Sequence, residues 1–349
     1  MIKVGIIGTG SFAHMHAQAL ESLGDRVRIV GAASPNYTEL LEFNRRHAIP
    51  RGYQSNTELL AEAQPDMVHI CTPPATHAAI AKLCLAAGTH VLCEKPLCGS
   101  LAAFDELDAA THLSGKSLSN IFQWRFGSAA QKLKALIDSG ALGELRVAVC
   151  HTLWYRGEDY YAVQWRASWE DALGGTLMGH GIHLIDLLLW LVPDWQEVYA
   201  RVNTFDFDIE VENLGAALIT FGNGAAGSVI SSSVSRREET TLRLDFQKAT
   251  VEVRGLYTYD NDNWMFTSPD ADLVAAWNAK SNIANGLEAQ IAATLDALER
   301  GTPAPVSGSE ARRILEFMTA TYKSAFTRQR VERNSILPAD PFYHTMRGV

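Results

Sequence analysis

The stretch KVGIIGTGSFA, residues 3–13, decides the class of fold. A short β-branched run, KVGIIG (3–8), ends in glycine, and GTGSFA (8–13) follows in a G-x-G-x-x-A pattern ahead of the helical stretch HAQALESLG. In dinucleotide sites such a pattern lets Gly8 form a tight turn, Gly10 admit a pyrophosphate to the backbone, and Ala13 pack a helix on the strand. Glycines often mark only a turn, so the strand and helix around them carry the prediction.

Three further apolar runs repeat the rhythm of strand and helix: VRIVGAA (27–33), DMVHICT (66–72) and THVLCEK (89–95). The last two flank a helical segment, AAIAKLCLAAG, so the sequence predicts a doubly wound α/β fold with a parallel sheet. Ligands in such sheets bind beyond the carboxyl ends of strands, where Thr72 and Pro73 stand. The same Thr-Pro-Pro run is also typical of a rigid loop, and both interpretations can hold.

The residue that distinguishes the two nicotinamide cofactors follows the second run, at Ser34-Pro35-Asn36. An NAD site usually has an acidic residue there to hold the ribose 2′-hydroxyl, and Ser34 replaces it. A hydroxyl does not repel a 2′-phosphate, although no arginine directly follows Ser34 to bind one. The sequence therefore favours NADP slightly over NAD.

The second half of the chain has a different pattern, with strand-like runs from about residue 146 and a hairpin turn at 222–224. These runs predict an antiparallel sheet, and residues 286–300 and 308–327 predict helices with a loop between them. Several small and apolar positions in the runs fit either a subunit interface or a sheet face covered by the chain's own helices: Ala216, Ala217, Leu218, Ile219, Val229 and Ile230.

Length and composition indicate a globular protein of two domains, since the chain has 349 residues, 47% of them hydrophobic. We place the domains at 1–123 and 124–349. A net charge of −9 with scattered arginine pairs argues against nucleic-acid binding. The five cysteines show no C-x-x-C spacing, which argues against a disulfide framework or a zinc site and fits a reducing cytoplasm. No charged leader precedes IKVGIIG, and LLLWLV (187–192) is too short to span a membrane, so we expect a buried helix end.

Taken together, GTGSFA, ICTPPATH, AAGTHVLCEKP, SGALGELR, QWR and GGTLMGHGIHLIDLLLWL resemble the Gfo/Idh/MocA family, which includes glucose-fructose oxidoreductases and inositol dehydrogenases. The resemblance covers nearly the whole chain. It implies an N-terminal Rossmann domain and a C-terminal α+β domain with a large, mostly antiparallel open-faced sheet, through which subunits pair as a homodimer or homotetramer. It also implies NAD(P)-dependent hydride transfer between nicotinamide and a secondary alcohol or ketone of a sugar, cyclitol or related polyol.

By this resemblance Lys95 is the catalytic lysine, Glu94 lies near the cofactor, and the Lys95-Pro96 peptide is cis. The chemistry agrees, because a lysine whose pKa is lowered by burial can take the hydroxyl proton as the hydride leaves carbon. A surface lysine in a turn is the alternative. Trp165 also fits ordinary core, Arg166 a surface charge, and His77 a helix cap. The resemblance implies these cofactor-binding residues: Gly8, Gly10, Ser11, Phe12, Ser34, Asn36, Thr72, Pro73, His77, Glu94, Lys95, Arg125, Trp165 and Arg166.

GGTLMGHGIH, residues 174–183, sets His180 and His183 three positions apart. His183 matches the family's catalytic histidine, but the aspartate that the family usually carries four residues earlier is Gly179 here. We therefore expect His183 to act with Lys95, His180 to reach the substrate from the side, and Asp186 to contact substrate or orient an imidazole. We expect no metal site, because HxxH plus an acid has low specificity and the family reaction needs no metal. Simple core packing of His183 is the stronger alternative.

Two other functions stay open at the level of sequence. One is an NAD-assisted glycosidase of the same fold, which oxidises and re-reduces its substrate without net redox. The other is a cofactor-sensing regulator without catalysis, against which Lys95 and His183 count. Neither the sugar, the carbon that is oxidised, nor the direction of reaction follows from the residues.

Overall fold

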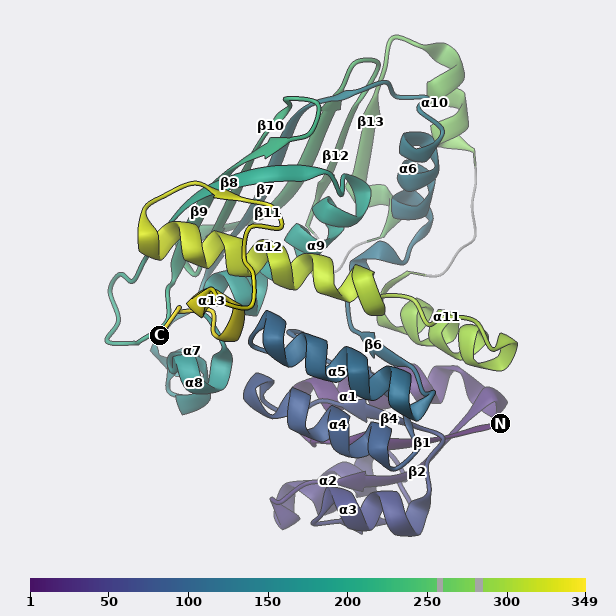
Figure 1. The fold of residues 1–349 in the computed structure, drawn as a ribbon. Helices are drawn as coiled ribbons and strands as arrows, with labels where there is room; N and C mark the ends of the chain where they lie inside the picture. The colour runs from purple at the N-terminus through teal and green to yellow at the C-terminus, as the bar shows by residue number, and fades with distance from the viewer. Residues whose placement is uncertain (256–259, 280–284) are drawn as a thin grey trace. The chain divides into compact units, whose positions relative to one another are not determined.

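The computed structural model describes residues 1–255, 260–279 and 285–349, which form two compact units (Figure 1). The first unit contains Met1–Ile121 and Leu287–Arg312, and the second contains Phe122–Gly286 and Arg313–Val349. The sequence assigned 287–312 to the second domain. Its contacts place this segment in the first unit, because Ile291 and Leu295 are buried in that unit's core.

The first unit is built on a six-stranded sheet in which every neighbouring pair is parallel. The strand order β3-β2-β1-β4-β5-β6 reverses at β1, as in dinucleotide-binding sheets. The doubly wound fold predicted from KVGIIGTGSFA is therefore confirmed. The strands are β1 (Ile2–Ile7), β2 (Val27–Ala33), β3 (Gly52–Tyr53), β4 (Met67–Ile70), β5 (His90–Cys93) and β6 (Leu118–Asn120).

Helices cover both faces of this sheet (Figure 1). On one face α1, α2 and α11 enclose a core that includes Ile6, Leu20 and Phe43, all about fully buried. On the other face α4 packs on α5. The helices of the unit are α1 (Ser11–Ser22), α2 (Tyr37–Arg46), α3 (Asn56–Glu58), α4 (His77–Ala86), α5 (Leu101–Ser114) and α11 (Gly286–Arg300).

The second unit is built on an eight-stranded sheet of order β13-β12-β11-β7-β10-β9-β8-β14. All its pairs are antiparallel except β7 with β10, so the mostly antiparallel sheet is confirmed. The predicted hairpin turn at 222–224 joins β9 to β10. The strands are β7 (Leu145–Tyr155), β8 (Trp195–Asn203), β9 (Leu214–Phe221), β10 (Ala226–Ser232), β11 (Val234–Phe246), β12 (Thr250–Arg254), β13 (Trp264–Thr267) and β14 (Val331–Glu332).

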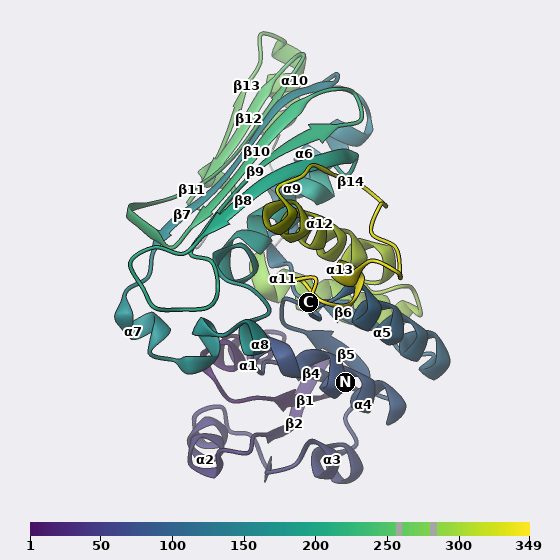
Figure 2. The same ribbon diagram turned by 60° about the vertical axis from the view of Figure 1, so that its left-hand side comes forward.

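Helices α6, α9 and α12 lie on one side of this sheet (Figure 2). Alternate residues of the central strands point to them, so Ala217, Ile219 and Val229 are buried, whereas Leu218 on the outer face is 64% exposed. The chain's own helices thus cover the inner face, and a subunit interface on the outer face stays a prediction. The helices are α6 (Ser128–Asp138), α7 (Glu158–Tyr161), α8 (Trp169–Ala172), α9 (Ile182–Leu191), α10 (Ala271–Asn278), α12 (Gly308–Thr327) and α13 (Pro341–His344).

The stretch Trp169–Leu191 is the one helical segment of the described residues that is long and apolar enough to cross a membrane by composition. In the structure 78% of its apolar window is buried inside the protein. Leu187, Leu188 and Leu191 are among its fully buried side chains, as expected for the helix end at 187–192. The segment is the core helix region of the second unit.

Candidate active site

The glycine turn after β1 has the shape that the sequence predicts. Gly8 has a φ of +94°, and a Cβ there would lie 2.7 Å from the backbone oxygen of Cys71. A Cβ on Gly10 would have no atom of the described residues within 4 Å, so these residues leave the turn open in front of Gly10. Helix α1 starts at Ser11 with no side-chain cap on its first N–H groups, and Ser11 and Phe12 are exposed. Open space in front of uncapped N–H groups fits the pyrophosphate of a dinucleotide.

Ser34 and Asn36 lie at the carboxyl end of β2, the neighbouring strand. Ser34 is buried, and its Oγ accepts the Asn36 N–H at 3.3 Å. Asn36 in turn caps α2 by accepting the Glu39 N–H. The residues therefore stand at the strand end where a ribose is recognised in this type of sheet.

The loop after β4 is fixed by His77, which is buried at the start of α4. Its Nε2 lies 2.8 Å from the Thr72 carbonyl oxygen, and its Nδ1 lies 2.7 Å from the Pro96 carbonyl oxygen. Burial lowers the pKa of His77, although the two carbonyls favour the charged form. With both nitrogens on backbone carbonyls, His77 holds the Thr72-Pro73 loop to the loop that carries Lys95. This placement favours a positioning role for the ring.

Lys95 follows β5, at the same edge of the sheet as the glycine turn. Burial lowers the pKa of Lys95, and the nearby Glu94 carboxylate offsets this only in part. The Lys95-Pro96 peptide is cis, as predicted. Asn120 on β6 donates to the carbonyl oxygens of Cys93 and Glu94 at 2.9 and 3.1 Å, which fixes the backbone before the lysine.

A buried polar network that the sequence analysis missed lies behind Lys95. The Glu94 Oε2 accepts the Lys95 N–H at 3.1 Å, while its Oε1 lies 3.0 Å from His16 Nε2. The other nitrogen of His16 lies 2.9 Å from Nδ1 of His69, on β4. Burial opposes a charge on His16, but the Cys71 sulfur and the Glu94 carboxylate outweigh it and raise the pKa of His16 to about 10.

The protonation states of His16, His69 and Glu94 are compatible with one another. Burial and the neighbouring His16 charge hold the pKa of His69 well below its usual range, so His69 is neutral and its Nδ1 accepts from His16. A charged His16 then donates to both His69 and Glu94. Helix α1, strand β4 and the Glu94-Lys95 segment are thereby tied together by one imidazolium. The sequence around His16 does not indicate this role, because a histidine among alanines is also typical of an ordinary helix.

In the second unit, three of the glycines in GGTLMGHGIH are required by close packing. A Cβ on Gly174 would clash with the Tyr322 hydroxyl, one on Gly175 with the Glu212 backbone, and one on Gly181 with Ser231. Glu212 is also missed by sequence reasoning. Its carboxylate accepts the N–H groups of Gly175 and Leu177 and the Tyr322 hydroxyl, and burial raises the pKa of Glu212 to about 7 despite these donors.

Gly179 differs from these glycines, because among the described residues a Cβ there would lie at ordinary contact distance, 3.8 Å, from the Tyr160 hydroxyl. Packing among these residues therefore does not require a glycine at the position of the family aspartate.

The two histidines have different surroundings. Residues Leu177–Gly181 form a π-helical turn, and α9 begins only at Ile182. The buried His180 ring lies 5.0 Å from Trp154 and 5.4 Å from Tyr160, between ring centres. The half-buried His183 ring lies 5.0 Å from Trp124 and 6.2 Å from Phe122. His180 and His183 are three residues apart in sequence, but their rings lie in two separate aromatic environments.

Arg125 and Asp186 form a buried bidentate ion pair, with Nε and Nη2 of the arginine donating to the two carboxylate oxygens at 2.7 and 2.5 Å. The exposed fraction of each side chain is 3% or less. Because a buried carboxylate needs such a partner, this pair explains the burial of both residues. Substrate binding by Asp186 and cofactor binding by Arg125 stay predictions.

Trp165 and Arg166 lie in the turn Gln164–Ala167, both half-buried. The Arg166 guanidinium stacks on Tyr160 at 4.4 Å and on Trp165 at 5.4 Å from the ring centres. Within residues 1–255, 260–279 and 285–349, no group of three His, Cys, Asp or Glu side chains has an arrangement suited to a metal ion.

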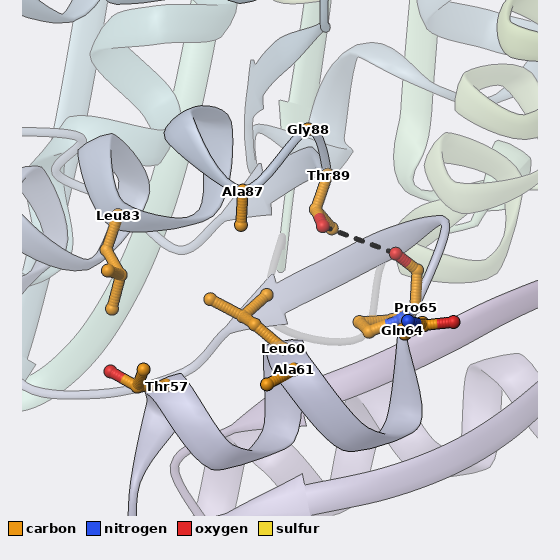
Figure 3. Close-up of a pocket in the computed structure, with 9 residues that line it drawn as sticks. All are labelled: Thr57, Leu60, Ala61, Gln64, Pro65, Leu83, Ala87, Gly88 and Thr89. Atoms are coloured by element: carbon orange, nitrogen blue, oxygen red, sulfur yellow. Dashed lines mark hydrogen bonds between the residues drawn. The ribbon is translucent and has the colours of Figure 1, made fainter.

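A separate hollow of about 450 Å³ lies in the first unit, between Leu60, Leu83 and Thr89 (Figure 3). It is at the amino ends of β4 and β5, because Pro65 lies two residues before β4 and Thr89 directly before β5. The glycine turn and Lys95 are at the carboxyl ends, so the hollow is distinct from the predicted cofactor site.

Comparisons with known proteins agree with the geometry. Residues 2–122 match the oxidoreductase family with an NAD-binding Rossmann fold, and residues 130–252 match the GFO/IDH/MocA C-terminal domain. Mouse trans-1,2-dihydrobenzene-1,2-diol dehydrogenase (Mus musculus) is 26% identical over 261 residues, which cover 73% of this chain and 75% of that protein. D-apiose dehydrogenase from Paraburkholderia graminis is 25% identical over 351 residues, covering 96% and 90% of the two chains.

Among solved structures, the WlbA dehydrogenase from Bordetella pertussis, in complex with NADH and UDP-GlcNAcA, superimposes with a TM-score of 0.85. It is 28% identical, and the alignment covers 97% of this chain and 99% of that one. The two matched domains follow each other along the chain in the order that the sequence predicts. The protein therefore belongs to the Gfo/Idh/MocA family of NAD-binding oxidoreductases.

Proposed function

We propose that the protein is an NAD(P)-dependent dehydrogenase or reductase that acts on a secondary alcohol or ketone of a sugar, cyclitol or related polyol. The observation that carries the proposal is the pairing, at one edge of the parallel sheet, of a glycine turn open at Gly10 with a lysine whose pKa is lowered. Relatives named for diol and sugar oxidation, and a neighbour solved with a nucleotide sugar, support the substrate class.

The residues that hold the dinucleotide in this proposal are those of the glycine turn, the β2 end and the loop after β4. The nicotinamide, when bound, accepts or returns the hydride. Lys95 takes the hydroxyl proton when the carbon loses hydride, so that the alcohol becomes a ketone. A lowered pKa increases the fraction of neutral amine near pH 7, which this role requires. Glu94 and His16 hold the lysine backbone in place.

His183 is the second catalytic residue of the proposal, as partner of Lys95 in proton transfer or in binding the substrate hydroxyl. His183 is half-buried on α9. His180 and Asp186 are assigned to substrate binding, and Asp186 also holds the Arg125 side chain in place.

Ser34 supports NADP as a slightly preferred cofactor, with NAD also used. A serine at the β2 end presents no charge to a 2′-phosphate. NADH in the WlbA structure supports NAD use by this type of fold.

We assign cofactor binding to residues 1–123, and substrate binding and self-association to residues 124–349. The exposed apolar side chains on the outer sheet face, Tyr199, Leu218 and Met265, support pairing of two or four copies through this sheet. The five cysteines are free thiols, which supports a cytoplasmic location.

The test is to incubate the purified protein with NAD⁺ or NADP⁺ and a panel of polyols, sugars and cyclitols, and to follow reduced cofactor by absorbance. We expect net formation of reduced cofactor with at least one class. Glycoside cleavage without net reduced cofactor identifies the NAD-assisted glycosidase instead. Cofactor binding without any turnover identifies a regulator.

A further inference from the structure

Glu212 binds three consecutive backbone N–H groups at the start of the helical segment 177–191, which consists of the π-helical turn and α9. Its two carboxylate oxygens accept the Gly175 N–H at 2.8 Å and the Leu177 N–H at 3.0 Å. Its backbone carbonyl oxygen accepts the Thr176 N–H at 2.9 Å. One residue from the loop before β9 thus satisfies the donors that a helix leaves unpaired at its first turn.

The described residues of this turn provide no cap of their own. Thr176 precedes the π-helical turn and makes no side-chain hydrogen bond to it, and the first turn contains no acidic residue. The Thr176 hydroxyl instead lies 3.1 Å from the Ser231 hydroxyl on β10, between the two oxygens. The first N–H groups of a helix carry the positive end of its dipole, where a carboxylate is favourable. Glu212 therefore provides this carboxylate from a distant part of the chain.

The Glu212 carboxylate is held in place from a second direction by α12, which lies on the same side of the sheet as α9 (Figure 2). The Tyr322 hydroxyl donates to the carboxylate at 2.9 Å, and Glu212 itself is 3% exposed. A Cβ on Gly175 would clash with the Glu212 backbone, and a Cβ on Gly174 with the Tyr322 hydroxyl. Because the backbone and both side chains are this closely packed, the position of the carboxylate and the position of the turn depend on each other.

The charge of Glu212 does not serve the stability of the fold. The titratable side chains that face it are Tyr322 of α12 and Tyr161 of α7, and burial raises the pKa of both. Burial also raises the pKa of Glu212 to about 7, although the N–H groups and the hydroxyl that donate to it oppose the shift. The protonated form therefore stabilises the fold fully below pH 4.5, and this contribution is lost as the pH rises through 7. We expect a charge that opposes folding at neutral pH to serve the site.

We infer that Glu212 is a positioning residue for His180 and His183, whose helical segment its carboxylate holds at the first turn. His180 lies in the π-helical turn and His183 in the first turn of α9. The inference rests on the proposed catalytic role of His183 and adds the residue that fixes where its segment begins. Each turn of a helix is hydrogen-bonded to the turn before it, so a shift of the first turn displaces both imidazoles. A displacement of about 1 Å at a reacting group can cost about 100-fold in rate.

The experiment replaces the charge at constant size with Glu212→Gln. An amide presents an NH₂ group in place of one carboxylate oxygen, and this group does not accept a backbone N–H. We measure kcat/KM between pH 5.5 and 8.5 and, at each pH, hydrogen exchange of the peptide 173–185 by mass spectrometry. At pH 8.5 the variant should have about 10-fold lower kcat/KM and faster exchange than the wild type. At pH 5.5 the two proteins should differ by less than about 2-fold, because Glu212 is then protonated in the wild type.

Comparison at equal pH separates this effect from that of the catalytic base. Loss of a positioning charge gives a finite step in kcat/KM, whereas protonation of a base gives a fall that continues with pH. Tyr322→Phe removes one donor to the carboxylate, so the pKa of Glu212 rises and the step should move up by about 1 pH unit.

Glu316→Gln is the matched control. Glu316 is also buried, lies on α12 like Tyr322, and accepts a backbone N–H, that of Asn334 at 3.1 Å. We expect it to change neither the step in kcat/KM nor the exchange of the peptide 173–185.

A loss in Glu212→Gln that is the same at every pH overturns the inference, as does unchanged exchange of the peptide. Activity of this variant equal to that of the wild type at pH 8.5 overturns it too. If Glu212→Gln does not fold, a step that Tyr322→Phe leaves in place has the same meaning. If the wild type turns over no substrate, faster exchange at pH 8.5 that disappears at pH 5.5 supports the inference and contradicts the proposed dehydrogenase.

Discussion

The buried pair of His16 and Glu94 makes the stability of the protein depend on pH in a direction opposite to that of a carboxylate with a lowered pKa. The pKa of His16 is about 10 in the folded protein, against an ordinary value of 6.5. A raised folded-state pKa stabilises the fold fully below pH 6.5, and the stabilisation is lost as the pH rises through 10. Between these limits the free energy of unfolding falls by about 1.4 kcal/mol per pH unit.

The perturbation that tests this is His16→Gln. Glutamine can still donate one hydrogen bond but carries no charge, and His16 is fully buried with Glu94 as its charged partner. Removing one member of a buried ion pair costs about 3–5 kcal/mol. We expect a loss of this size in the free energy of unfolding at pH 6.5. At pH 9 the variant should lose only about 1–2 kcal/mol relative to the wild type, because most of the stabilisation by the protonated His16 is already absent from the wild type at this pH.

The assay is denaturant unfolding of both proteins at pH 6.5, 7.5, 8.5 and 9. The difference between them is the quantity of interest, because it cancels buried thiols such as Cys150, which also destabilise the fold at high pH. His14→Gln is the control on the same helix. Burial lowers the pKa of His14 below 6.5, so the ring is neutral in both states above about pH 7.5 and its removal should leave the pH dependence there unchanged. A His16→Gln difference that stays constant from pH 6.5 to 9 would refute the charged pair.

Four further predictions concern activity and assembly. Lys95→Ala should lower kcat by about 10²–10⁴-fold while cofactor binding, measured by fluorescence titration, stays nearly unchanged; a near-normal kcat removes Lys95 from the mechanism. Ser34→Asp should shift the kcat/KM ratio toward NAD⁺, and unchanged NADP⁺ use would mean that Ser34 does not face the ribose. His183→Ala should reduce kcat/KM more than His180→Ala, and the acidic limb of the pH profile should disappear only with the true base. Leu218→Glu should lower the oligomeric state in sedimentation analysis, whereas Leu113→Glu, an exposed leucine on α5, should not.

The elements of the fold followed from the sequence because their patterns are local. VRIVGAA coincides with β2, Val27–Ala33, and the predicted helices at 286–300 and 308–327 coincide with α11 and α12. The unit to which a helix belongs is not local information. The segment Leu287–Arg312 follows the second unit's sheet in sequence, yet it packs its apolar face on the first unit. The pattern of an amphipathic helix shows that one face packs on an apolar surface, but it does not show which unit provides that surface.

The same distinction applies to the site. Lys95 was predictable because its motif is contiguous, whereas His16, His69 and Glu94 are distant in sequence and meet only when α1, β4 and β5 assemble. Glu212 likewise reaches Gly175 and Leu177 from the loop before β9, 37 and 35 residues away in sequence. Neither network has a sequence spacing that a motif can express.

The glycines of GGTLMGHGIH show how a structure separates residues that the sequence leaves equivalent. Gly174, Gly175 and Gly181 have neighbours that leave no room for a side chain, so we expect their replacement to destabilise the fold. A Cβ on Gly179 would make an ordinary contact of 3.8 Å with the Tyr160 hydroxyl, so we expect its replacement to test function more than packing. An aspartate restored there would place a negative charge beside Tyr160, on which Arg166 stacks.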